Sequence, residues 1–407
     1  MRKTIKDIAK YLGPAFIVSV AYVDPGNFAT NISGGSQFNY DLLWVILISN
    51  IMAIFLQINS AKLGIATSKN LSQMCREIFS KRTNIILWIF AELAAIATTM
   101  AEFLGGALGL YLLFNIPMPV AGILTAIITY LLAYLQKYGQ RVIEIIITIF
   151  IAIVCGAYAI EMFLAAPDWL QIGKHVIMPM IPNNQALLIA VGMLGATVMP
   201  HVIFLHSELV QSRNHDMELS RKKRHLKMEK IDVVIAMNIA FIVNAAMVIV
   251  SASVFYKQGL VVDTIELAHQ SLKPLLGNLS SLAFGIALLA SGFSSSVVGT
   301  MAGESVMDGF INLKLSNNVK RLITMLPAIL VIIIGVNPMQ ALLFSQVSLS
   351  LVLPMAIIPL LIITNKKEVM GVFTNKRMTK ILGIMIALII IGLNIVLIFT
   401  TLKNYVG

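Results

Sequence analysis

The chain has 407 residues, of which 58% are hydrophobic and only 12% are charged. Ordinary soluble domains carry about 25% charged residues, so this composition excludes most soluble enzymes, a disordered chain and a coiled coil. The formal net charge of +11 would suggest nucleic-acid binding in a soluble protein. The composition instead predicts a polytopic membrane protein, with residues 1–407 forming one all-α transmembrane domain.

Eleven hydrophobic runs are long enough to cross a bilayer as helices, which takes roughly 20 residues. A transmembrane β-barrel is excluded because the apolar residues are continuous and do not alternate with polar ones. The first run is not a signal peptide, because Asp24 interrupts it and no small-residue cleavage site follows. The predicted spans cover residues 12–36, 42–66, 85–114, 117–136, 142–165, 184–210, 232–256, 275–303, 319–336, 339–364 and 380–402.

Lysines and arginines indicate the orientation of these spans, because cytoplasmic loops carry an excess of them. With the N-terminus in the cytoplasm, 26 of the 30 basic residues fall on the inner side, and the outer side keeps Lys174, Lys257, Lys273 and Lys403. The sequence therefore predicts a cell-membrane protein with a cytoplasmic N-terminus and an extracellular C-terminus. The basic run at 221–224 then belongs to an inner loop and not to a nucleic-acid site.

Two spans are interrupted near their middle by a proline beside polar residues. The first contains Asp24-Pro25-Gly26-Asn27, and the sixth contains Ala196-Thr197-Val198-Met199-Pro200-His201. Proline removes an N–H and moves the preceding residue out of helical geometry, so each break should free backbone carbonyls and redirect one side chain. Either break alone could be an ordinary proline kink.

Two breaks at matching positions are typical of a transporter built from repeats, with its binding site near the bilayer midplane. The spacing predicts a first repeat over 11–165 and a second over 184–364, followed by a separate span over 380–402. The second repeat should be inverted in the membrane, because each repeat contains an odd number of spans.

The residues at the breaks predict a cation site. Asp24 offers a carboxylate, Asn27 an amide oxygen, Met199 a thioether and Ala196 a freed carbonyl. Calcium and magnesium prefer oxygen ligands alone, whereas a thioether favours softer transition metals. The set therefore suggests Mn²⁺ or Fe²⁺, with Co²⁺, Zn²⁺ or Cd²⁺ as alternatives. Ordinary core packing is the competing interpretation of Met199.

These motifs resemble those of the natural resistance-associated macrophage protein (NRAMP) family of proton-coupled divalent metal transporters. The likeness covers about residues 10–400 and includes Gly13-Pro14-Ala15, Leu205-His206-Ser207 and Val210-Gln211-Ser212-Arg213. It implies a LeuT-like fold of two inverted five-helix repeats plus an eleventh helix. It also implies that the metal is coordinated by Asp24, Asn27, Met199 and the carbonyl of Ala196, with Gln346 as a further ligand.

Titratable residues within the spans are candidates for a proton path. His201 follows the second break directly, and the pKa range of histidine suits proton handling. His206 is five residues further on, roughly 140° around a helix, so the two should not chelate one ion. Glu102 within the third span needs a partner, and Arg321 is the best available one. By resemblance, Glu102, His201 and Arg321 match the family's proton network. The alternative for both histidines is a satisfied polar group at a helix contact.

The sequence departs from the family pattern on the proton side. Thr99 stands where the third helix usually has an aspartate, and Lys320 where a second arginine is usual. Val202 and Val352 replace an asparagine and a glutamine of the family. The metal-binding set is complete, whereas the proton set lacks a carboxylate. We therefore expect metal transport to be retained and proton coupling to be weakened or rerouted.

Several other functions compete with metal–proton symport. The same fold could carry Mg²⁺ or a sodium-coupled amino acid, although Met199 argues against both. A metal uniporter and an ion channel both remain open. A membrane enzyme is not expected, because the chain contains no His-Glu-x-x-His and no Gly-x-Ser-x-Gly. The expected partners are divalent metal ions as substrate, protons as co-substrate and the lipid bilayer, with no cofactor, nucleic acid or obligate protein partner.

Overall fold

The structure is a computed structural model that describes residues 13–213, 218–313 and 315–406, with side chains described to residue 400. These residues form an almost entirely helical bundle without strands. The helices are α2 (Pro14–Ala21), α3 (Pro25–Phe38), α4 (Leu43–Thr67), α5 (Leu71–Ile78), α6 (Lys81–Phe114), α7 (Met118–Tyr134), α8 (Gln140–Ala165), α9 (Trp169–Ile177), α10 (Asn184–Thr197), α11 (Pro200–Leu209), α12 (Leu219–Val254), α13 (Ile265–Leu276), α14 (Asn278–Ile311), α15 (Asn317–Ile334), α16 (Pro338–Val352), α17 (Pro354–Asn365), α18 (Lys367–Met370) and α19 (Arg377–Val406). Short 3-10 turns are η1 (Leu135–Tyr138), η2 (Val210–Arg213), η3 (Tyr256–Gln258) and η4 (Gly371–Phe373).

The predicted membrane spans correspond to the long helices. Ten helical segments of the described chain are long and apolar enough to cross a membrane. The predicted first span is divided between α2 and α3, which have only 8 and 14 residues and are each too short to cross alone. Residues 11 and 12 of the predicted first repeat lie outside the described residues. The chain is thus a multi-pass helical membrane protein.

Several boundaries differ from the prediction. Helix α12 begins at Leu219 and not near residue 232, because its charged first turns are good helix formers that water can solvate. The predicted tenth span is divided into α16 and α17, because Pro354 lacks the N–H that would continue the helix. The short helices α5, α9 and α13 lie in connections that the hydrophobic pattern left without structure.

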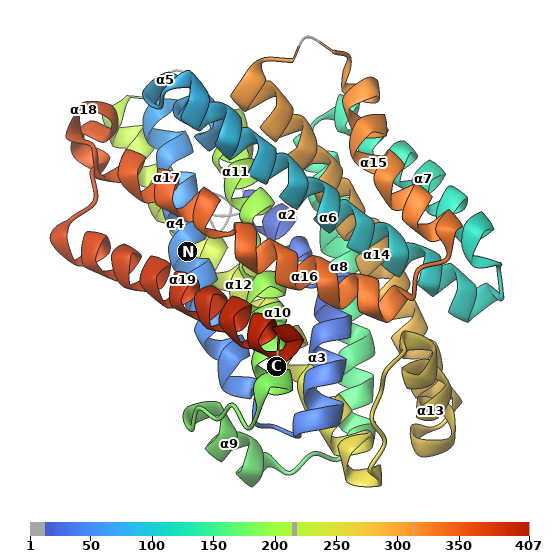
Figure 1. Ribbon diagram of the computed structural model, residues 1–407. Helices are drawn as coiled ribbons and strands as arrows, with labels where there is room; N and C mark the ends of the chain where they lie inside the picture. The colour runs from blue at the N-terminus through green and yellow to red at the C-terminus, as the bar shows by residue number, and fades with distance from the viewer. Residues whose placement is uncertain (1–12, 214–217, 314, 407) are drawn as a thin grey trace, which may run out of the picture.

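The short helices mark the two ends of the bundle. Helices α5 and α18 lie at one end, and α9 and α13 lie at the opposite end (Figure 1). This is the arrangement expected of a chain that crosses the bundle repeatedly, because connections then alternate between two sides. The two broken helices, α2 with α3 and α10 with α11, lie near the centre of the view (Figure 1).

Candidate metal site

The two helix breaks have the same local geometry. Helix α3 begins at Pro25 and α11 begins at Pro200, so Asp24 and Met199 each occupy the N-cap position. Both residues have extended backbone, with φ of −80° at Asp24 and −85° at Met199. This confirms the expectation that each proline moves its predecessor out of helical geometry.

The side chains at these N-caps behave differently. One carboxylate oxygen of Asp24, Oδ1, accepts a hydrogen bond of 2.8 Å from the backbone N–H of Asn27. The amide oxygen of Asn27 accepts in return from the backbone N–H of Asp24, at 3.2 Å. This reciprocal capping fixes both side chains at the start of α3. Met199 makes no side-chain cap.

Neighbouring helices bind two of the carbonyls at the first break. The carbonyl of Tyr22 accepts from the side chain of Asn244 at 2.6 Å, and that of Val23 accepts from Ser291 at 2.5 Å. The carbonyls of Ala21 and Ala196 lack their usual helical N–H donor, because the residue four positions after each is a proline. Both lie at the C-terminal end of a half-helix, where the helix dipole favours a cation.

Gln346 of α16 closes over both breaks. Its amide nitrogen lies 3.5 Å from the second carboxylate oxygen, Oδ2, of Asp24. A Cβ atom on Gly26 would overlap the Gln346 side chain, and a Cβ on Gly195 would overlap the Gln346 carbonyl oxygen. Glycine at these two positions therefore lets α16 approach α3 and α10 closely.

The predicted metal ligands are completely buried. Asp24, Asn27, Ala196, Met199 and Gln346 are all 0% exposed. The Asn27 amide nitrogen and the Gln346 amide oxygen have no protein partner. Within the described residues, no cluster of three or more His, Cys, Asp or Glu could hold a metal. A cation here would thus depend on one carboxylate, with amide oxygens, a freed carbonyl and a thioether completing its shell.

The structure places His201 one helical turn from Glu102 along α6, because the Thr98 that it contacts precedes Glu102 by four residues. The Nδ1 atom of His201 lies 3.1 Å from the hydroxyl of Thr98. The Glu102 carboxylate is buried against α14, since a Cβ on Gly299 would overlap it, and neither of its oxygens has a hydrogen-bond partner. Thr99 is also buried, with an unpartnered hydroxyl.

The expected pairing of Glu102 with Arg321 is wrong. Arg321 of α15 instead bonds the Glu304 carboxylate, and it donates to the Gln136 side chain at 3.0 Å. Glu304 lies on the same helix as Gly299, five residues further along, which is about 7.5 Å of axial rise. Arg321 therefore pairs with Glu304, near the C-terminal end of α14. Glu102 packs against the same helix at Gly299, closer to its middle.

His206 belongs to a different neighbourhood from His201, as the helical spacing predicts. Its Nδ1 lies 2.8 Å from the Gln57 side-chain oxygen, and its Nε2 lies 3.0 Å from the Glu229 carboxylate. Gln57 donates in turn to the Tyr22 hydroxyl at 2.5 Å. His206 thus connects α11 to α4 and α12 through a buried polar network that reaches the first break.

Comparison with known proteins identifies the family. Residues 15–400 match the family model described as natural resistance-associated macrophage protein-like. The chain belongs to this family. It is 66% identical over 399 residues to the divalent metal cation transporter MntH of Clostridium acetobutylicum, covering 98% of this chain and 93% of that protein. It is 47% identical over 398 residues to MntH of Bacillus subtilis, covering 98% and 94%.

Solved structures confirm the expected fold of this Nramp protein. The manganese transporter of Eremococcus coleocola superposes with a TM-score of 0.86 at 34% identity, covering 100% of this chain and 90% of that one. The transporter Mhp1 superposes with a TM-score of 0.62 at 14% identity, covering 96% and 93%, which concerns the fold alone. The Nramp protein thus has the LeuT-like fold, whereas the repeat boundaries 11–165 and 184–364 stay predictions.

Several polar residues of this Nramp protein were not predicted from its sequence. Tyr22, Gln57, Asn244 and Ser291 hold the first break in place, and all four are nearly or completely buried. A signal was available for Gln57 and Asn244, because an amide within an apolar span needs a partner. The sequence did not indicate which partner each would find.

Proposed function

We propose that this protein imports divalent transition-metal ions of the Mn²⁺ and Fe²⁺ class as a secondary transporter. The observation that carries the proposal is the pair of matching breaks. They hold the Asp24 carboxylate and the Met199 residue at equivalent N-cap positions, with α16 packed over both. The names of the relatives, divalent metal cation transporters, support the same substrate class.

The proposed ligands contribute differently to the binding of the metal ion and to its selection. Asp24 supplies the single negative charge, and Asn27, Gln346 and the Ala196 carbonyl supply neutral oxygens. Met199 supplies the soft sulfur that favours a transition metal over Ca²⁺ or Mg²⁺. One carboxylate leaves a divalent ion with net positive charge, which suits reversible binding better than a permanent structural site.

The burial of these ligands supports transport by alternating access. Because each is 0% exposed, a metal ion can enter or leave only if helices around the site move. Gln346 is the contact expected to change, since α16 covers the breaks in α3 and α10. Separation of α16 from either broken helix would open a path to the metal.

We propose that metal transport is retained, whereas the coupling of protons to it is weakened or rerouted. Glu102 and His201 remain near the site, but Thr99 cannot carry a proton as the aspartate usual in the family can. Glu102 of α6 packs against α14 at Gly299. The first carboxylate on α14 after Gly299 is Glu304, which forms an ion pair with Arg321. The route we propose runs from Glu102 to the Glu304–Arg321 pair. Metal uniport with weak proton coupling is the second candidate, favoured by a threonine at position 99, where the family usually has an ionisable aspartate.

We propose that the end of the bundle with α5 and α18 faces the cytoplasm of the cell membrane and that the C-terminus is extracellular. The connections at this end carry most of the basic residues, as the excess of positive charge in cytoplasmic loops predicts. Cysteines introduced at exposed Lys69 and Lys257 should test this in intact cells. A membrane-impermeant thiol reagent should label the Lys257→Cys variant but not the Lys69→Cys variant. Labelling of Lys69→Cys but not of Lys257→Cys would show the opposite orientation.

The decisive test is Mn²⁺ uptake into proteoliposomes, with Mg²⁺ and Ca²⁺ as competitors. Asp24→Ala should abolish uptake, whereas Asp263→Ala, at an exposed aspartate between α12 and α13, should leave it unchanged. Normal uptake by Asp24→Ala would contradict the site. Equal competition by Mg²⁺ would favour a magnesium transporter instead.

A further inference from the structure

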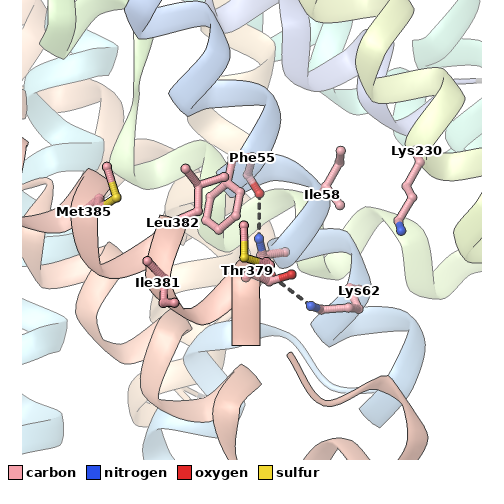
Figure 2. Close-up of a pocket in the computed structure, with 10 residues that line it drawn as sticks. Phe55, Ile58, Lys62, Lys230, Thr379, Ile381, Leu382 and Met385 are labelled. Carbon is pink, nitrogen blue, oxygen red and sulfur yellow. Dashed lines mark hydrogen bonds between the residues drawn. The ribbon is translucent and has the colours of Figure 1, made fainter. Parts of the chain in front are cut away.

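A groove between α4 and α19 lies outside the metal site. Its volume is about 370 Å³, which is within the usual range for small-molecule sites. Figure 2 shows Phe55 of α4 beside Leu382 of α19. Ile58 of α4 and Ile381 and Met385 of α19 also line the groove. Leu382 is 44% exposed and Met385 is 51% exposed, so the α19 side of the groove is open and apolar. Such a surface is suited to contact with a hydrocarbon chain.

Two lysines stand at the groove without a counter-charge. Lys62 of α4 and Lys230 of α12 both line it, and no acidic residue does. Lys62 is 9% exposed, and its ammonium donates to the side-chain oxygens of Asn59, at 2.9 Å, and Asn375. Both acceptors are neutral amides, and among the described residues no carboxylate forms an ion pair with either lysine. An ammonium has three N–H donors, so Lys62 keeps one for a further acceptor.

The position of Lys62 matches the headgroup level of a bilayer. Lys62 is five residues before the end of α4, which is about 7.5 Å along the helix. Thr379, which also lines the groove, is the third residue of α19. The charged end of the groove therefore lies near the helix ends, and its apolar part runs towards the membrane interior. Basic pockets between transmembrane helices are known to bind anionic lipid headgroups.

We propose that this groove binds an anionic phospholipid. Its phosphate would lie between the ammonium groups of Lys62 and Lys230, and one acyl chain would lie along Phe55, Leu382 and Met385. The bound lipid would neutralise two positive charges that the protein itself leaves uncompensated. It would also fill the space between α4 and α19, which meet across this groove.

Native mass spectrometry of the detergent-purified protein tests the proposal. The probes are phosphatidylglycerol and phosphatidylcholine with identical acyl chains. The native chain should retain one phosphatidylglycerol in preference to phosphatidylcholine. Lys230→Gln should weaken retention about fivefold, since a lysine near an anionic lipid contributes about 1 kcal/mol. Lys227→Gln, at an exposed lysine of the same helix that does not line the groove, should leave retention unchanged.

A second variant tests the apolar part without touching a charge. Leu382→Trp should fill the groove and reduce phosphatidylglycerol retention, because residue 382 faces the groove on an exposed surface. Unchanged retention in both Lys230→Gln and Leu382→Trp would overturn the proposal. Displacement of the lipid by inorganic phosphate alone would also overturn it, because the site would then recognise free phosphate. A dimer that excludes lipid would instead assign the groove to a second copy of the chain.

Discussion

Gln346 and Asp24 are 322 residues apart in the chain, yet the Gln346 amide nitrogen lies 3.5 Å from the Asp24 carboxylate. This contact joins α16 to the first broken helix at the residue that supplies the only carboxylate among the proposed metal ligands. It also explains the glycines at positions 26 and 195, because a side chain at either would displace Gln346. The contact therefore depends on small residues in two other helices.

Gln346→Ala should weaken metal binding without abolishing it. The variant loses an amide oxygen as ligand and a hydrogen bond to Asp24, but it keeps the carboxylate. Loss of a group that supports a metal site typically costs about 10–100-fold in affinity, so the KM for Mn²⁺ uptake should rise by about tenfold. Gln340→Ala, at an exposed glutamine of the same helix, is the control and should behave like the native chain. An unchanged KM in Gln346→Ala would exclude Gln346 from the site.

Met199→Ala should make Mn²⁺ uptake sensitive to Ca²⁺. The variant removes the soft sulfur and leaves only oxygen ligands, which a hard cation accepts. Met193→Ala is the matched control, because Met193 is equally buried on α10 but lies away from the break. Both variants should lose about 2–5 kcal/mol of stability through cavity formation. Only Met199→Ala should admit Ca²⁺ as a competitor, and equal Ca²⁺ inhibition of both would assign the effect to loss of packing.

Gly195→Ala should separate α10 from α16 and destabilise the protein. The added Cβ would overlap a backbone oxygen, which cannot move aside as a flexible side chain can. Overpacking of this kind costs about 1–3 kcal/mol, and the thermal unfolding midpoint in detergent should fall accordingly. Gly156→Ala, in the open on α8, has no atom within 4 Å of the added Cβ. Its midpoint should stay the same or rise slightly, because alanine favours the helix.

Glu304→Gln should destabilise the protein far more than the loss of a surface ion pair. It would leave Arg321, which is only 4% exposed, without its carboxylate. Breaking a buried pair costs about 3–5 kcal/mol. Glu77→Gln breaks the exposed Lys69–Glu77 pair of 2.6 Å and should cost less than about 1 kcal/mol. Thermal unfolding compares the two, and equal small losses would show that water reaches Arg321.

Thr99→Asp should strengthen the coupling of protons to metal transport. The substitution restores a titratable group at a buried position one turn from Glu102. Metal-stimulated proton influx, followed with a pH-sensitive dye inside proteoliposomes, should rise relative to Mn²⁺ uptake. Thr99→Asn adds similar volume without a titratable group and should not raise influx. Strong, stoichiometric influx in the native chain would contradict the weakened-coupling hypothesis.

Sequence reasoning predicted the parts of this protein that local chemistry controls. Hydrophobic runs predicted the long helices, and proline predicted the breaks, because a missing N–H acts within four residues of the chain. The same reasoning predicted that Asp24 and Met199 would leave helical geometry. It missed the division of the tenth span at Pro354, although proline was equally visible there.

Contacts between distant helices were beyond the sequence by itself. Arg321 was assigned to Glu102, but the structure gives it to Glu304, because the choice depends on which carboxylate α14 presents at that depth. His206 meets Gln57 and Glu229 for the same reason. The sequence alone determined the membrane class, the breaks and the residue types of the proposed metal site. Only the tertiary structure decided which side chains meet. Pairing depends on how each helix is rotated about its axis and how deep it lies in the bundle, and the local sequence does not determine either.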